Sequence, residues 1–228
     1  MAATHVQYLQ KSASPRLIEA KPHPDLRMVV VIPCHNEPDL AGALGRLADC
    51  EPPLGQAEVI VVINGSEKNS AEVARQNQHT LGQATDWLAG RGDYWLPIHL
   101  LHLPDLPPRH AGVGQARKTG MDEALRRLAD VGQAEDGLLV CYDADCRCSA
   151  NYFTGIELHF AAQPNAPGCS IHFEHPLDAG EWTALGFGDT APGQKVFDGI
   201  AAYELHLRYH VRAQKFIGFP YGFHTIGS

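Results

Sequence analysis

The sequence lacks a long hydrophobic run. No stretch approaches the roughly 20 apolar residues that a membrane-spanning helix needs, and the start, MAATHVQYLQKSA, lacks the apolar core of a secretory signal. An excess of positive charge is also missing, with 18 Lys and Arg against 26 Asp and Glu and a formal net charge of -8. Binding along a nucleic-acid duplex needs concentrated Lys and Arg. We therefore predict a cytoplasmic protein that is not an integral membrane protein and that binds no nucleic acid.

Paired Cys-x-x-Cys spacings, which structural zinc sites usually use, are absent as well. Cys146 and Cys148 form a Cys-x-Cys without a matching partner, and Cys141 lies in a hydrophobic run, where cysteine commonly packs as a small hydrophobe. The six cysteines of a cytoplasmic protein are expected to be reduced. The pattern favours packing and turn roles, and a thiolate zinc site remains an alternative.

The sequence does have a regular alternation of buried strands and helices. Continuous apolar runs typical of strands buried on both faces predict strands at 27–33, 57–66, 95–104 and 137–143. Apolar residues at helical spacing predict helices within 35–50, 69–88 and 114–130. This alternation predicts an α/β fold, a doubly wound and mostly parallel sheet flanked by helices on both faces.

The flanking segments have a looser pattern. Residues 1–26 read as an N-terminal extension with a short helix at His5–Lys11, residues 27–150 as the α/β subdomain, and residues 151–228 as a further region. In that further region we expect a helix in NYFTGIELHFAAQ, a strand in CSIHFEH, a Gly-rich loop at 176–194 and a long helix at 195–216.

Polar residues follow three of the predicted strands, as Cys34–Glu37, as the turn sequence Asn64–Ser66 and as Asp143–Asp145. Ligands of open α/β sheets bind beyond the carboxyl ends of the strands, where these residues would meet. In the stretch LLVCYDADCRC, Asp143 and Asp145 can converge on one divalent cation, because Mg²⁺ and Mn²⁺ prefer oxygen ligands. An Asp-x-Asp after a strand is also a common turn and helix-capping device.

Four segments follow one another over residues 28–150: VVVIPCHNE, VIVVINGS, GVGQARKTGMDEA and VCYDADC. In order and spacing they resemble the glycosyltransferases of GT-A fold, most closely family 2. The resemblance implies transfer of a sugar from a nucleotide-diphospho-sugar to an unidentified acceptor, with Mn²⁺ or Mg²⁺ as cofactor. It also implies that residues 27–150 bind the nucleotide-sugar and that residues 151–228 form the acceptor side.

The resemblance assigns the first group of site residues to the nucleotide. Pro33, His35 and Glu37 would line its pocket, with Glu37 accepting hydrogen bonds from ribose hydroxyls. Asn64 stands where the family usually has a base-reading aspartate, and an amide can both donate and accept, so the base stays open. His35 can instead cap the turn, and Glu37 suits a helix N-terminus with or without a ligand.

The second group would meet the diphosphate. Arg117 would lie near the base or diphosphate, Lys118 would assist, and Asp143 and Asp145 would hold ribose and metal. Arg117 and Lys118 can alternatively form a solvated helix face.

The general base is the part of the chemistry that the sequence does not assign. Inverting members of the family usually take it from a segment after the strand that YGFHTIGS resembles, so we expect a chain incomplete at its C-terminus and of uncertain activity. The carboxylates nearest in sequence to the acceptor side match no motif; they are Asp178, Glu181, Asp189 and Asp198. Glu174 and His175 can meet an acceptor or serve structure alone.

Two other functions remain open. One is a non-catalytic nucleotide-binding module, which the unassigned base favours. The other is a nucleotidyltransferase, which usually carries a Gly-rich, basic phosphate loop after its first strand; PCHNEPDL supplies neither feature.

Overall fold

The computed structural model describes residues 4–11, 13–92, 94–172 and 225–226. Its helices and strands are, in chain order, α1 (Thr4–Lys11), β1 (Leu26–Cys34), α2 (Leu40–Ala48), β2 (Gln56–Ser66), α3 (Ala71–Gly90), β3 (Ile98–Leu106), the 3-10 helix η1 (Pro108–His110), α4 (Val113–Asp130), β4 (Leu138–Cys141), α5 (Tyr152–Ala162), β5 (Ser170–Ile171) and β6 (Thr225–Ile226).

The chain divides into two units, Met1–Leu158 and His159–Ser228. The first unit holds the main sheet, and in the second β5 pairs in parallel with β6. The segment boundaries at residues 26 and 150 stay a prediction. The loop expected at 176–194 and the helix expected at 195–216 lie outside the described residues.

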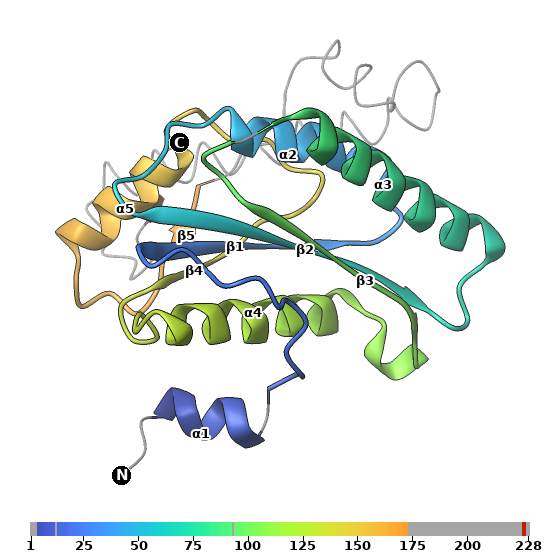
Figure 1. Ribbon diagram of the computed structural model, residues 1–228, viewed down its shortest axis with the longest axis horizontal. Coiled ribbons are helices and arrows are strands. Elements are labelled where there is room, and N and C mark those ends of the chain that lie inside the picture. The colour runs from blue at the N-terminus through green and yellow to red at the C-terminus, as the bar shows by residue number, and fades with distance from the viewer. Residues whose placement is uncertain (1–3, 12, 93, 173–224, 227–228) are drawn as a thin grey trace, which may run out of the picture. The chain divides into compact units, whose positions relative to one another are not determined.

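The main sheet has four strands in the order β3-β2-β1-β4, and every neighbouring pair is parallel. Helices α2 and α3 lie along one face and α4 along the other, with α1 beyond α4 (Figure 1). The predicted α/β fold with a parallel sheet between helices is therefore confirmed. In this order the carboxyl ends of β1, β2 and β4 lie at one edge of the sheet, next to one another.

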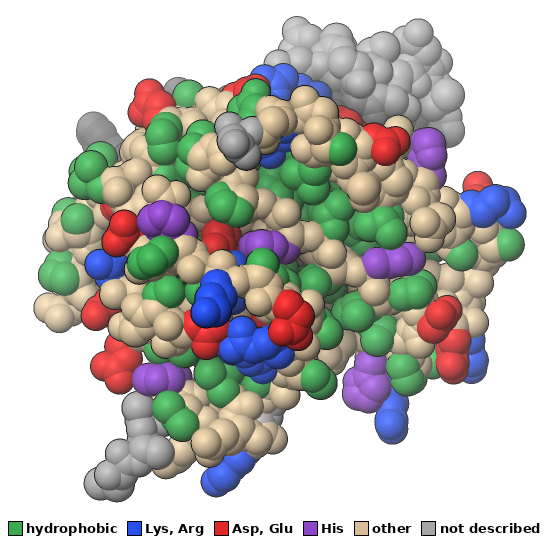
Figure 2. All heavy atoms as spheres, in the orientation of Figure 1, with side chains coloured by type: hydrophobic (Ala, Val, Ile, Leu, Met, Phe, Trp, Pro, Cys, Tyr) green, Lys and Arg blue, Asp and Glu red, His purple; other side chains and the backbone are tan. Residues whose placement is uncertain are grey.

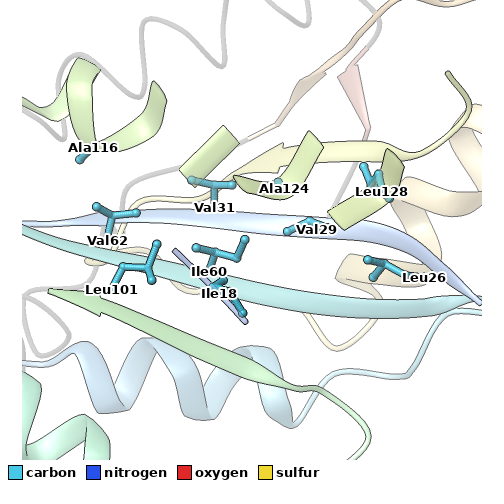
Figure 3. Close-up of a cluster of buried hydrophobic side chains, with 10 residues drawn as sticks. All are labelled: Ile18, Leu26, Val29, Val31, Ile60, Val62, Leu101, Ala116, Ala124 and Leu128. Atoms are coloured by element: carbon cyan, nitrogen blue, oxygen red, sulfur yellow. The ribbon is translucent and has the colours of Figure 1, made fainter. Parts of the chain in front are cut away.

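Alternate residues of the strands enter two separate apolar layers, because successive side chains of a strand point to opposite faces. Figure 3 shows the layer beneath α4, where Val31 and Val62 face Ala116 and Ala124 of the helix. Ile18, from the segment before β1, is buried in the same cluster. The strands thus read as continuous apolar runs because helices or loops cover both faces.

Gly120 sets how closely α4 approaches the sheet. A Cβ at this position would overlap the Cγ1 methyl of Val31 and lie 3.2 Å from Cγ2 of Val62. Only a glycine therefore allows the helix backbone to rest on β1 and β2 at this distance.

The segment before β1 is held by the charged side chains of α4. The Asp122 carboxylate accepts hydrogen bonds from Tyr8 Oη (2.7 Å) and from the backbone N–H of Ser14 (2.6 Å). The Glu123 carboxylate accepts from the N–H groups of Leu17 (3.1 Å) and Ile18 (3.2 Å). Both carboxylates are 1% exposed, so α4 buries its acidic side chains against the N-terminal segment. Figure 2 shows acidic and basic side chains adjoining where this segment and α4 lie.

A buried ion pair links α4 to the middle of the sheet. Arg127 Nε donates to Glu58 Oε2 of β2 at 2.6 Å, and Arg127 Nη1 donates to the carbonyl of Ala20 at 2.7 Å. Arg127 and Glu58 are 1% and 2% exposed. His99 Nε2 of β3 lies 3.5 Å from the same carboxylate oxygen. Burial by itself would raise the pKa of Glu58, but His99 and Arg127 outweigh it and lower that pKa to about 2.

One local prediction is wrong. Asn64–Ser66 is not a turn: β2 continues to Ser66, and its register with β3 shifts between Asn64 and Ser66. Gly65 makes this shift possible, since a Cβ there would lie 2.6 Å from the carbonyl oxygen of Pro104.

In the part of the chain that the structure describes, no helix is long and apolar enough to cross a membrane. The cytoplasmic location stays a prediction.

Candidate functional site

A hollow of about 190 Å³ lies at the carboxyl ends of β1, β2 and β4. Each of these strand ends contributes to its wall, and so does the first residue of α4. The residues lining it are Pro33, Cys34, His35, Glu37, Asn64, Val113, Asp143, Ala144 and Asp145. The structure therefore brings together six of the eight residues singled out from the sequence, from three segments of the chain.

The turn after β1 has a fixed conformation. Asn36 has a φ of 53°, a left-handed conformation that asparagine tolerates better than most residues, and its N–H donates to Asn77 Oδ1 of α3 at 2.7 Å. Thr80 Oγ1 of the same helix donates to the carbonyl of Glu37 at 2.5 Å. Helix α3 thus holds the turn that presents His35 and Glu37 to the hollow.

His35 is oriented by the end of β2. Its Nδ1 lies 2.8 Å from the backbone oxygen of Asn64, and a carbonyl only accepts, so Nδ1 carries the proton. In the neutral ring Nε2 is then the acceptor. The same backbone oxygen also accepts from Asn77 Nδ2 at 3.1 Å, which ties α3, β2 and the turn into one network.

The Asn64 side chain is 1% exposed, and its two polar atoms differ in their partners. Its Nδ2 donates to the carbonyl of Ala111 at 2.5 Å, whereas its buried Oδ1 has no partner within the described segments. The bond to Ala111 settles which way the amide points. From the sequence, the Asn64 amide could either donate to a ligand or accept from it. In the structure its donor is used by Ala111, and its acceptor oxygen is left without a hydrogen bond from the described residues.

Asp143 and Asp145 line the hollow from the turn after β4, and both are exposed. Arg117 Nη2, from α4, donates to Asp143 Oδ1. Arg117 Nε is buried and has no hydrogen-bond partner within the residues described. Arg117 is therefore at the edge of the hollow, joined to it through Asp143.

The carboxylates offer a divalent cation part of a ligand set. A metal site made of protein ligands alone would need three or more His, Cys, Asp or Glu side chains close together. No such group is found among the described residues, which are 4–11, 13–92, 94–172 and 225–226. Mg²⁺ usually takes only one or two carboxylates and completes its octahedron with waters and substrate phosphates. Two hard oxygen donors on one wall of an open hollow fit a cation that arrives with a diphosphate.

Three further residues line the hollow: Cys34, Val113 and Ala144. Cys34 and Ala144 belong to the strand-end segments that the sequence indicates, although no role is assigned to them there. Val113 carries no such signal, because only the packing of α4 brings it to the hollow. Burial, and secondarily the charge of Glu37, raises the pKa of Cys34 to about 12, so this residue is a neutral thiol and not a nucleophile.

Lys118 lies elsewhere. Its Nζ is 2.6 Å from Asp122 Oδ2 and 5.6 Å from the centre of the Tyr8 ring, and it is not among the lining residues. A helix turns Lys118 about 100° from Arg117, which directs it toward the N-terminal segment. The assisting role expected for Lys118 has no support from this placement.

The acceptor-side residues singled out from the sequence all lie outside the described residues. They are Glu174, His175, Asp178, Glu181, Asp189 and Asp198.

Comparison with known proteins gives one finding. The family model described as Glycosyl transferase family 2 matches residues 29–182, which include the three strand ends and the whole lining of the hollow. No curated protein and no solved structure matches the chain. Since the matched segment covers more than half of the sequence, this chain belongs to glycosyl transferase family 2.

Proposed function

We propose that the chain is a metal-dependent glycosyltransferase that takes its sugar from a nucleotide-diphospho-sugar. The observation that carries this proposal is the meeting of Asp143 and Asp145 with the ends of β1 and β2 around one hollow. Family membership supports sugar transfer as the reaction class.

The nucleoside would bind on the wall formed by β1 and β2. Glu37 is suited to accept from ribose hydroxyls, and Pro33 and His35 supply an apolar edge and a ring beside it. Asn64 Oδ1 can accept a hydrogen bond from a ligand N–H, because the Asn64 amide nitrogen already donates to the carbonyl of Ala111. The imide-type N–H of uracil and that of guanine both satisfy this requirement.

The diphosphate would bind on the wall formed by the turn after β4. Asp145, together with Asp143, would hold Mn²⁺ or Mg²⁺, which neutralises the charge of the diphosphate as it leaves. Arg117 has a buried Nε without a hydrogen-bond partner in the described part and can donate to a phosphate oxygen once a ligand competes for the Asp143 pair.

The acceptor hydroxyl must lose a proton as it attacks the anomeric carbon, and this requires a base. We assign that role to no described residue.

A nucleotide-release assay with UDP-sugars and GDP-sugars tests the proposal. We expect release that needs Mn²⁺ or Mg²⁺, stops with chelator, and falls roughly 100-fold or more in Asp145→Ala, the scale for losing one group that stabilises developing charge. Asp86→Ala is the matched control, because Asp86 is an exposed carboxylate on α3 remote in sequence from every lining residue.

Metal-dependent nucleotide binding without any release in the wild type would favour the non-catalytic nucleotide-binding module. Full release by Asp145→Ala would contradict the metal site itself.

A further inference from the structure

Two cysteines far apart in sequence lie side by side, and neither of them lines the hollow. Cys50, two residues after the end of α2, and Cys148, three residues after Asp145, have their Sγ atoms 3.6 Å apart although 98 positions separate them. All six cysteines of the chain are free. The proposed sugar transfer uses neither thiol.

The backbone keeps the two sulfurs together. The N–H of Glu51 donates to the carbonyl of Ala150 at 2.8 Å, so the segments that carry the two cysteines are bonded next to the thiols. Cys50 Sγ also lies 3.4 Å from the carbonyl of Ser149. A disulfide needs a sulfur separation of about 2 Å, which a rotation of the two side chains can provide without moving these segments far.

The two thiols differ in chemistry. The hydrogen bond from Cys50 lowers the pKa of Cys148, burial opposes this, and the Tyr142 hydroxyl and the charge of Arg46 lower it further. The same contact with Cys148, together with burial, raises the pKa of Cys50. Cys148 is also the more accessible of the two, half-buried where Cys50 is 4% exposed. Cys148 is therefore the sulfur that an oxidant reaches first, and Cys50, 3.6 Å away, is the neighbour that can resolve it.

We propose that Cys50 and Cys148 form an oxidation site, at which a hydroperoxide converts the two thiols into an intramolecular disulfide. The bond would tie the loop that follows Asp145 to the end of α2. The site adds to the chain a reaction that is independent of sugar transfer.

The steps balance with hydrogen peroxide as the oxidant, provided that the proton Cys148 loses on ionising is taken up by the hydroxide that the peroxide releases. The Cys148 thiolate attacks one peroxide oxygen, the O–O bond breaks, hydroxide leaves, and the sulfur is oxidised to a sulfenic acid. The Cys50 sulfur then attacks that sulfur, the S–O bond breaks, and the Cys50 proton leaves with the hydroxide as water. Two thiols and one peroxide thus give one disulfide and two waters.

Trypsin separates the cysteines cleanly enough to test this on the full chain. Cleavage at Lys and Arg places Cys50 in 47–68, Cys141 and Cys146 in 128–147, and Cys148 with Cys169 in 148–195. After one equivalent of peroxide, alkylation and digestion without reductant, we expect peptide 47–68 cross-linked to peptide 148–195. The cross-link should persist in Cys169→Ser and disappear after reduction with dithiothreitol.

Single variants test the order of events. In Cys50→Ser the resolving thiol is missing, so a dimedone adduct should accumulate on Cys148. In Cys148→Ser both the cross-link and any adduct on Cys50 should be absent. Two results would overturn the proposal, whether or not the chain transfers sugar. One is that Cys50 and Cys148 are both found alkylated in the oxidised wild type, and the other is a cross-link from peptide 47–68 to peptide 128–147.

Discussion

Two regions of the first unit differ in whether their buried polar groups have hydrogen-bond partners. Along α4, Glu58 and Arg127 are almost fully buried and satisfy each other, and Asp122 and Glu123 are satisfied by the segment before β1. Around the hollow, Asn64 Oδ1 and Arg117 Nε are buried without hydrogen-bond partners in the described chain, and the turn holds Asn36 at positive φ.

The difference separates stability from function. A buried charge that loses its partner is strongly destabilising, so the buried charged side chains of α4 must find their partners within the chain. A binding site leaves part of its hydrogen bonding to the ligand, and unmatched buried groups are one mark of this. Substitutions should therefore reduce folding stability in the first region and ligand binding in the second.

The same substitution, Glu to Gln, should have different effects in the two regions. Glu58→Gln removes the charge opposite Arg127 and should lower the free energy of unfolding by roughly 3–5 kcal/mol. Glu37→Gln, on the wall of the hollow, should change it by no more than about 0.5 kcal/mol. Urea denaturation measures both; equal losses would remove the distinction between the regions.

The Glu58 pair also predicts a dependence of stability on pH. The pKa of Glu58 is lowered from an ordinary value of 4.5 to about 2, so its contribution is present above pH 4.5 and is lost as the pH falls toward 2. The gap between wild type and Glu58→Gln should therefore shrink by roughly 2 kcal/mol from pH 6 to pH 3. A gap that stays constant over this range would show that the carboxylate is not stabilised by its neighbours.

A smaller effect tests the packing that positions Arg117. Gly120→Ala should destabilise the fold by about 1–3 kcal/mol, because the added methyl overlaps Val31 and α4 must move. In Gly82→Ala of α3 a Cβ meets nothing within 4 Å, and removing a mid-helix glycine should stabilise by roughly 0.5–1 kcal/mol. Thermal unfolding of the two variants should shift in opposite directions; a stabilised Gly120→Ala would refute the close-approach argument.

The sequence predicted the sheet and most of the hollow's lining for a physical reason. Parallel strands buried on both faces read as uninterrupted apolar runs, and residues that follow such runs must meet at one sheet edge. That logic predicted that Asn64 and Asp143 lie at this edge, and the family resemblance added Pro33.

The remaining features depend on contacts over long sequence separations, which leave no periodic signal. Asp122 and Glu123 look like solvent-facing helix residues, yet they are buried because the segment before β1 folds onto them. Val113 in the hollow and the Cys50–Cys148 pair have the same origin. The role of Lys118 stays a prediction; its side chain lies away from the lining because a helix directs neighbouring side chains to different faces.

Calorimetry of nucleoside diphosphate binding tests the account most directly. UDP and GDP should be titrated into wild type and Asp145→Asn, each with and without Mn²⁺, with Asp86→Asn as the control. We predict that Mn²⁺ tightens binding of at least one nucleotide to wild type and to the control, and that Asp145→Asn loses most of this gain while unfolding at the wild-type temperature. An equal Mn²⁺ effect in all three proteins would contradict the assignment of the metal to Asp145.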